Sequence, residues 1–387
     1  MEKEIERLLD EAVSNGEVAG CNALVLADGK EIAYAESGYK NIEDLTPFER
    51  DTIVRLYSMS KPITSAAVIW LMDNGVIDLE DPVEKYIPSF ANAHVATKGG
   101  RVNALRSVTL RDLMNMAGGT VYPGNGTDAE RQSAALFDEV IRKLGTDKEI
   151  GTVELASRIG ENDLDFQPGE NFKYGTGADI LGAVVEVASG MRFGDFLKKE
   201  FFEPLEMPDT DFWVTEEKRE RLADVYETVG KEAKLNVTYN LGINYKMDHR
   251  PAFESGGAGL CSTLDDYAHF ADMLLNNGNY KGKTILSERA VKFMTNGSLA
   301  PWQQKGMDGW DGLTGYTYGN LLRVLKDPSR CVSYGEAGEY GWDGWLGAYF
   351  ANDPVNRITV LMGMQKINAG TWGLTRKVRN LVYKEVR

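Results

Sequence analysis

The residues with the clearest chemical potential are Ser58 and Lys61, which stand three positions apart. On a helix this spacing places both side chains on one face, about one turn apart. A serine hydroxyl becomes a good nucleophile when a neighbouring base takes its proton, and a desolvated lysine amine can be that base. The pair therefore predicts nucleophilic catalysis through a covalent serine intermediate.

The residues around this pair predict a buried helix that holds it in place. Pro62 is compatible with the first helical turn, where its missing N–H is not needed. Residues 66–72 are apolar nearly all round, which is typical of a helix in a protein core. Ser58 would then lie at the helix start, where free N–H groups favour developing negative charge. Because a four-residue pattern recurs by chance, the prediction depends on further motifs.

A tyrosine beside glycine forms the second candidate motif. The segment Tyr174-Gly175-Thr176 follows a turn at Pro168-Gly169 and precedes an apolar helix expected over residues 178–189. A phenol near a lysine ammonium can be held as phenolate and can relay protons as general base and acid. Tyr174 is therefore predicted to be the third catalytic residue.

The third motif is a glycine-rich stretch from Gly341 to Gly347, which is expected to open a strand. Its glycines would let a substrate lie along the strand edge. The backbone N–H of Trp345 could pair with that of Ser58 to hold an oxyanion.

Strand patterns lie at both ends of the chain and helical patterns in the middle. Strands are expected over residues 21–27, 31–39, 316–325, 345–352 and 358–364, and the Asp28-Gly29 pair predicts a hairpin between the first two. These patterns predict an α+β fold, in which an antiparallel sheet from both chain ends is flanked by helices. Residues 1–79 and 226–387 would form the sheet domain, and residues 80–225 an inserted, mostly helical domain.

The composition argues against several classes of partner. Asp and Glu number 58 against 43 Lys and Arg, so the net charge of −15 makes nucleic acid and anionic membranes poor partners.

The three cysteines lack the spacing of a metal site or a disulfide framework, which favours a reducing compartment. The sequence shows neither a signal peptide nor an apolar run that could span a membrane, so a cytoplasmic location is expected. No metal or cofactor is expected, because no metal-ligand cluster or phosphate-binding loop is present.

Taken in order, the three motifs resemble those of the serine β-lactamase and penicillin-binding-protein superfamily. The nearest resemblance is to its class C β-lactamase-like branch with the family VIII carboxylesterases. It extends over roughly residues 20 to 370 and includes further similar segments at 109–114, 166–170, 256–266 and 338–342. It implies a β-lactamase/transpeptidase-like fold and acyl transfer through a Ser58 ester. In this scheme Lys61 and Tyr174 share the proton transfers, and the N–H groups of Ser58 and Trp345 form the oxyanion hole.

Two departures from the family pattern bear on the substrate. Thr176 stands where class C β-lactamases and penicillin-binding proteins have an asparagine that helps to hold the substrate amide. Trp342-Asp343-Gly344 stands where they have Lys-Thr-Gly, which attracts the carboxylate that penicillins carry. If Asp343 faces the cleft, its charge would repel carboxylated ligands. Family VIII esterases also tend to lack this lysine.

These departures lead to a specific expectation: a serine carboxylesterase for neutral or cationic esters, with weak or absent β-lactamase activity. Its partner would be a small-molecule ester or amide. The loop from Thr120 to Thr127 would help to shape the pocket. The expected substrate contacts are Thr176, Trp342, Asp343, Gly344 and Tyr122.

Other functions remain open. Within enzymes, the alternative is an amide hydrolase of the β-lactamase or D-aminopeptidase type, in which Asp343 could bind a substrate ammonium. A non-catalytic, ligand-binding member of the same fold is a further alternative. A Ser-His-Asp hydrolase is disfavoured, because no Gly-x-Ser-x-Gly motif is present and the histidines His94, His249 and His269 lie outside any such motif.

Overall fold

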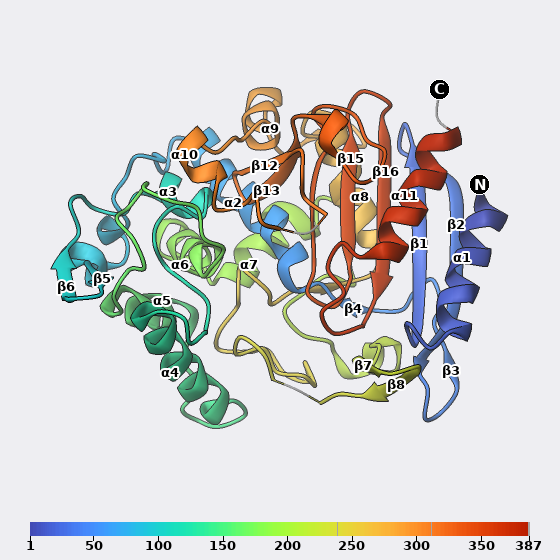
Figure 1. The fold of residues 1–387 in the computed structure, drawn as a ribbon, viewed down its shortest axis with the longest axis horizontal. Helices are drawn as coiled ribbons and strands as arrows, with labels where there is room; N and C mark the ends of the chain where they lie inside the picture. The colour runs from blue at the N-terminus through green and yellow to red at the C-terminus, as the bar shows by residue number, and fades with distance from the viewer. Residues whose placement is uncertain (238, 311, 386–387) are drawn as a thin grey trace.

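Strands from the two ends of the sequence lie side by side in one antiparallel sheet (Figure 1). The computed structural model describes residues 1–237, 239–310 and 312–385. Its eight-stranded sheet has the order β12-β13-β14-β15-β16-β1-β2-β3. The ends of the chain meet where β1 pairs with β16, in a register that sets Cys21 opposite Met364. The predicted α+β fold, with a sheet built from both termini, is confirmed.

The strands of this sheet come from residues before 48 and after 315. They are β1 (Gly20–Ala27), β2 (Lys30–Asn41), β3 (Thr46–Pro47), β12 (Tyr316–Gly319), β13 (Leu322–Leu325), β14 (Tyr340–Asp343), β15 (Tyr349–Asp353) and β16 (Ile358–Met364). Four short two-stranded pairs complete the set: β4 (Val54–Arg55) with β9 (Cys261–Ser262), β5 (His94–Thr97) with β6 (Gly100–Asn103), β7 (Tyr226–Val229) with β8 (Glu232–Leu235), and β10 (Asn279–Tyr280) with β11 (Lys283–Thr284).

Helices cover both faces of the sheet, because alternating strand residues are apolar on each side. On one face, α1 (Glu2–Ser14) and α11 (Gly373–Glu385) bury their apolar stripes against β1, β15 and β16. On the other face, α8 (Leu264–Leu275) packs against β15 and β16 and joins the larger core, which also contains α2 (Lys61–Asp73). As predicted, α2 is buried along most of its length.

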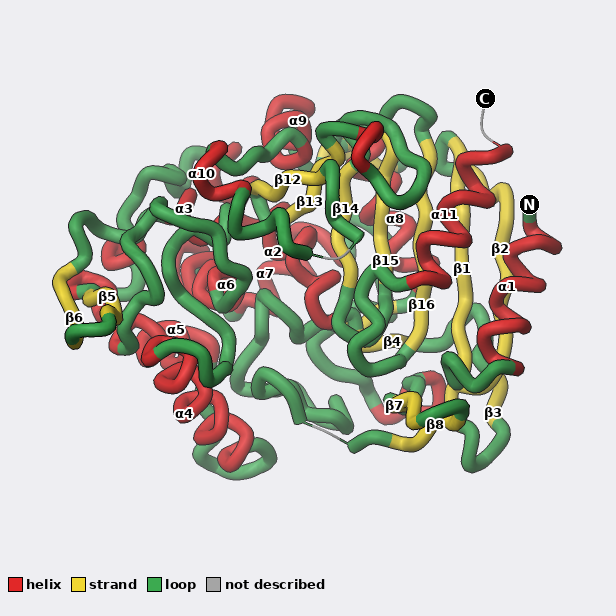
Figure 2. Tube along the Cα trace, viewed as in Figure 1, coloured by secondary structure: helices red, strands yellow, loops and turns green. Residues whose placement is uncertain are grey.

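The remaining helices lie mostly to one side of the sheet, as Figure 2 shows. They are α3 (Leu110–Met114), α4 (Asp128–Lys143), α5 (Thr152–Glu161), α6 (Gly177–Ser189), α7 (Phe193–Leu197), α9 (Glu288–Thr295) and α10 (Pro301–Gln304). Short 3-10 or π turns occur at Tyr57–Ser60, Val83–Lys85, Pro88–Asn92, Lys198–Phe202, Glu216–Arg221 and Pro328–Arg330. Among the described residues of 80–225, none belongs to the eight-stranded sheet. The division into two domains nevertheless stays a prediction.

Two local expectations are corrected. Residues 316–325 form a hairpin rather than one strand, because Asn320 and Leu321 both adopt positive φ, at 51° and 61°, as a tight two-residue turn requires. Trp345 lies in the turn between β14 and β15 instead of starting a strand, since Gly344 N–H donates to the Ala348 carbonyl. No helix within the described ranges is both long and apolar enough to cross a membrane.

Candidate active site

The segment that carries Ser58 is held in an unusual backbone conformation. Tyr57, directly before it, has a φ of 45°, which is uncommon for a bulky residue and costs conformational energy. Tyr57, Met59 and Ser60 are buried, whereas Ser58 is partly exposed. The surrounding core therefore fixes a strained turn that presents the Ser58 side chain outward at the entrance to α2.

Lys61 lies one turn after Ser58 and is completely buried, with 0% of its surface exposed. Its Nζ atom lies 3.2 Å from Ser58 Oγ, 3.1 Å from the Tyr122 hydroxyl and 2.8 Å from the Gly257 carbonyl oxygen. All three partners are uncharged. A protonated amine can donate to all three, whereas a neutral amine can donate to two and accept the Ser58 proton on its lone pair.

The proton affinity of Lys61 suits a general base. Burial lowers the pKa of its amine to about 7, although the negative charges of Asp179 and Asp343 oppose this shift. An ordinary lysine would be almost fully protonated at neutral pH. At this pKa, a substantial fraction of Lys61 is neutral and can take the hydroxyl proton of Ser58.

Two tyrosines enclose the Lys61 amine. Nζ lies 4.5 Å from the centre of the Tyr174 ring, and the rings of Tyr122 and Tyr174 meet edge to face with centroids 5.7 Å apart. Burial raises the pKa of Tyr174 above its usual value, although hydrogen bonds with Ser58 and Trp342 oppose the rise. The expectation that Tyr174 is held as a phenolate was therefore wrong in direction. Its neutral hydroxyl is available as a proton donor.

Strand β14 contributes one aromatic side chain to the site. Trp342 is buried, and its Nε1–H donates to the Tyr174 hydroxyl oxygen at 2.9 Å. Its ring also packs against Tyr318, with centroids 5.0 Å apart. Trp342 thus fixes Tyr174 with a neutral donor at the position where the resemblance would put a lysine.

The next residue, Asp343, points to the opposite face of the sheet. In the register of β14 and β15, Trp342 is opposite Phe350 and Asp343 is opposite Tyr349, and these partners belong to cores on different faces. Arg323, only 1% exposed, lies 3.4 Å from the Asp343 carboxylate. Burial raises the pKa of Asp343, and the Arg323 guanidinium opposes that rise. The charge of Asp343 is therefore offset by a buried cation, which weakens the expected repulsion of carboxylated ligands.

The turn after β14 packs directly against the nucleophile segment. A side chain at Gly344 would place its Cβ 2.2 Å from the Leu56 carbonyl oxygen, so only glycine allows this approach. The Trp345 ring meets the Tyr57 ring with centroids 5.1 Å apart. The segments that carry Ser58 and Trp345 are therefore in contact, while the role of their N–H groups in an oxyanion hole stays a prediction.

Thr176, a predicted substrate contact, is fully buried at the start of α6. Within the described chain its hydroxyl has no hydrogen-bond partner. The structure therefore does not bring this side chain to the surface of the site, and its contact with substrate stays a prediction.

Sequence reasoning missed two contributors, the Gly257 carbonyl and the Asp179 carboxylate, which lie behind the Lys61 amine. The Tyr122 hydroxyl lies beside the same amine, and its contact with substrate stays a prediction. Residues 256–259 are all small, but no local sequence pattern connects them to Lys61.

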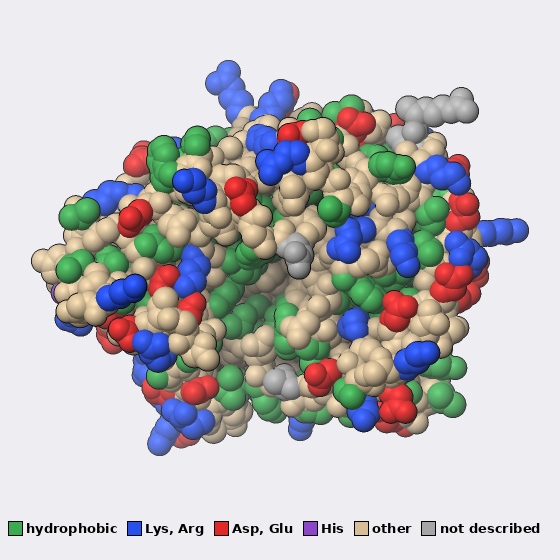
Figure 3. All heavy atoms as spheres, in the orientation of Figure 1, with side chains coloured by type: hydrophobic (Ala, Val, Ile, Leu, Met, Phe, Trp, Pro, Cys, Tyr) green, Lys and Arg blue, Asp and Glu red, His purple; other side chains and the backbone are tan. Residues whose placement is uncertain are grey.

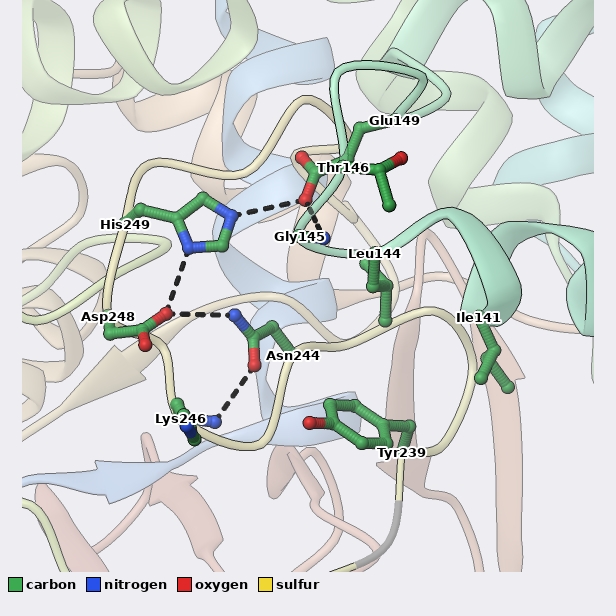
Figure 4. A pocket seen from close by; sticks show the side chains of 10 residues that line it. All are labelled: Ile141, Leu144, Gly145, Thr146, Glu149, Tyr239, Asn244, Lys246, Asp248 and His249. Carbon is green, nitrogen blue, oxygen red and sulfur yellow. Dashed lines mark hydrogen bonds and ion pairs between the residues drawn. The ribbon is translucent and has the colours of Figure 1, made fainter.

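A hollow lined with hydrophobic side chains lies near the centre of the face drawn in Figure 3, between the helices on the left and the sheet on the right. A separate cavity of about 580 Å³ contains His249 and is shown in Figure 4. His249 there lies between Asp248 and Glu149, at 2.8 and 3.1 Å, and none of the residues that contact Ser58 line this cavity. No group of three or more His, Cys, Asp or Glu among the described residues could hold a metal ion.

Comparisons with known proteins find relatives that match most of this chain. Esterase EstB from Burkholderia gladioli is 26% identical over 98% of this chain and 94% of its own length. Protein Rv1367c from Mycobacterium tuberculosis is 28% identical over 92% of this chain and 88% of its own length. Lovastatin esterase from Penicillium rubens is 27% identical over 78% of this chain and 73% of its own length.

Solved structures share the fold. EstCE1, described as a hydrolase with promiscuous acyltransferase activity, superposes with a TM-score of 0.82 at 22% identity, and 98% of each chain is covered. Unliganded simvastatin synthase LovD from Aspergillus terreus gives a TM-score of 0.79 at 18% identity, covering 99% of this chain and 98% of its own. The Beta-lactamase family model matches residues 5–370, and the chain therefore belongs to the Beta-lactamase family.

Proposed function

We propose that this protein is a serine carboxylesterase that hydrolyses uncharged esters through an acyl-Ser58 intermediate. The observation that carries the proposal is the buried Lys61 amine, 3.2 Å from Ser58 Oγ, with a pKa lowered to about 7 by burial. Such an amine can deprotonate a serine near neutral pH. Esterases among the relatives, EstB and lovastatin esterase, support the choice of reaction.

In the first step, the Ser58 oxygen attacks the ester carbonyl carbon while neutral Lys61 takes the hydroxyl proton. The new C–O bond converts the carbonyl oxygen to an oxyanion, which the N–H groups of Ser58 and Trp345 would stabilise. The intermediate then collapses with cleavage of the bond to the alcohol. The departing oxygen takes the proton of the Tyr174 hydroxyl, and the Lys61 ammonium returns a proton to Tyr174.

Deacylation reverses the roles of the same groups. Neutral Lys61 takes a proton from water as the water oxygen attacks the acyl carbon. The bond to Ser58 then breaks, and the proton returns to its oxygen. One set of groups can therefore serve as base and then as acid, because the pKa of Lys61 is close to neutral pH.

The preference for uncharged esters follows from the charges around the site. Trp342 offers an indole N–H to Tyr174 in place of a cation, and Arg323 is already paired with Asp343. A substrate carboxylate would find no free positive charge from these residues. Ester substrates are therefore favoured over penicillins.

The test is hydrolysis of p-nitrophenyl acetate and butyrate beside nitrocefin by the purified protein. We expect turnover of the esters and little turnover of nitrocefin, and a preference for nitrocefin would contradict the substrate class. Ser58→Ala should abolish activity. Ser14→Ala, which removes an exposed hydroxyl at the end of α1, serves as the matched control and should retain it.

A fluorophosphonate probe separates the enzyme from a non-catalytic binder on the same fold. The probe should label Ser58 in the unaltered protein and leave Ser58→Ala unlabelled, as read by intact mass. A protein that labels but turns over only lactams or D-aminoacyl amides would indicate the amide hydrolase instead.

A further inference from the structure

A buried carboxylate behind Lys61 is not used in the chemistry above. Asp179 lies in the first turn of α6, five positions after Tyr174, and is only 3% exposed. It accepts hydrogen bonds from the Ser255 hydroxyl and, at 3.0 Å, from the Gly257 N–H. A buried carboxylate is costly unless a cation or several donors compensate for it, so its presence here needs a reason.

Gly257 connects this carboxylate to the catalytic amine. Its N–H donates to Asp179, while its carbonyl oxygen accepts from Lys61 Nζ at 2.8 Å. A Cβ on Gly257 would lie 2.8 Å from both the Asp179 carboxylate and the Tyr122 hydroxyl. The backbone at 257 is thus packed between Asp179 and Tyr122, and the carboxylate fixes the carbonyl that orients the Lys61 amine.

The negative charges that act on Lys61 come from two elements, although only Asp179 lies on the same face of the sheet as the amine. Asp179 projects from α6 and Asp343 from β14, and both favour the protonated amine. Asp343 is compensated by Arg323, whereas the partners of Asp179 are the neutral groups Ser255 and Gly257. Burial raises the pKa of Tyr122 and of Tyr174, so both phenols are neutral. Asp179 is therefore the less compensated of the two negative charges near the amine.

We propose that Asp179 is a positioning residue that orients Lys61 through Gly257 and stabilises the ammonium formed when Ser58 is deprotonated. The inference rests on the proposed function, because it concerns the same proton transfer. Without the carboxylate, the amine would hold its proton less strongly, remain neutral at lower pH and act as a weaker base.

The test compares Asp179→Asn with Ser255→Ala. Asparagine keeps an oxygen that can accept from Gly257 N–H but removes the charge. Ser255→Ala keeps the charge but removes the hydrogen bond to Asp179, together with the one that the hydroxyl accepts from Ala258 N–H. The measurement is the rate of Ser58 labelling by a fluorophosphonate from pH 5 to 9, which requires the lysine but no ester turnover. Circular dichroism establishes folding, and Asp179→Ser is the second neutral variant if asparagine is not tolerated.

The acidic limb of the profile is the rise in labelling rate as Lys61 loses its proton, and the plateau is the constant rate above it. In Asp179→Asn we expect the midpoint of the acidic limb to move down by about one pH unit and the plateau rate to fall about tenfold. Ser255→Ala should leave the limb where it is in the unaltered protein. A neutral variant with a lower plateau but an unmoved limb would overturn the proposal, as would an equal shift in Ser255→Ala. Absence of labelling in the unaltered protein at every pH would overturn the proposed function together with this inference.

Discussion

Two fully buried basic side chains lie on opposite faces of the sheet, and their pKa values are shifted in opposite directions. Lys61 is surrounded by the uncharged oxygens of Ser58, Tyr122 and Gly257, and burial lowers its pKa to about 7. Arg379, on α11, meets the buried Glu339 carboxylate through two hydrogen bonds of 2.7 and 2.8 Å. Burial alone would lower the pKa of Arg379, but the Glu339 charge raises it well above its usual value.

The difference shows what converts a buried cation into a catalytic base. Burial acts on both side chains, but only the lysine amine, held by neutral acceptors, can lose its proton near neutral pH. The guanidinium keeps its proton, and the Glu339 carboxylate compensates its charge. Around Arg379, further hydroxyls from Tyr349 and Tyr316 complete a network that packs α11 onto the sheet. One region therefore provides reversible proton transfer, and the other provides structure.

The largest expected effect comes from placing a permanent cation in the catalytic region. Lys61→Arg keeps the charge but cannot provide a neutral base, because a guanidinium does not deprotonate in proteins. We expect ester hydrolysis to fall by roughly 10²–10⁴-fold, the usual contribution of general base catalysis. Steady-state kinetics with p-nitrophenyl butyrate measures the effect.

Lys61→Met is the matched control for that change. It should be equally inactive, yet at least as stable as the unaltered protein, because a buried polar group is replaced by an apolar one of similar length. Lys61→Arg should be less stable than Lys61→Met. If Lys61→Arg retained more than about a tenth of the activity, Lys61 would not be the base.

The next effect concerns stability and lies on the other face of the sheet. Glu339→Gln leaves the Arg379 guanidinium buried without its charge partner, and we expect a loss of about 3–5 kcal/mol in the free energy of unfolding. Urea denaturation followed by circular dichroism measures it. The double variant Glu339→Gln with Arg379→Met should recover part of the loss, since no unpaired charge remains. A loss below about 1 kcal/mol would mean that the carboxylate is not what holds this cation.

How much of this comparison could be predicted from sequence depends on the distance between the partners along the chain. Ser58 and Lys61 were identifiable because helical geometry fixes two side chains three positions apart, and the sheet followed from strand patterns at the two termini. The contact between Asp179 and Gly257 joins segments 78 positions apart, and no local periodicity encodes it. The error over the Tyr174 phenolate has the same origin, because desolvation depends on tertiary packing.

The smallest expected effect extends the comparison to the surface, at the cavity of Figure 4. Hydrogen bonds with Asp248 and Glu149 raise the pKa of His249, the shift expected where the acceptors are charged. A raised pKa in the folded state stabilises the protein below the unfolded value of about 6.5, and this contribution is lost as the pH rises through the folded pKa.

Because the His249 side chain is 42% exposed, solvent screening should limit the gain to a few tenths of a kcal/mol. We therefore expect His249→Gln to be slightly less stable than the unaltered protein at pH 5.5 and nearly equal at pH 9, as measured by urea denaturation in low salt. Equal stability differences at the two pH values would show that the carboxylates do not act on His249 through its charge.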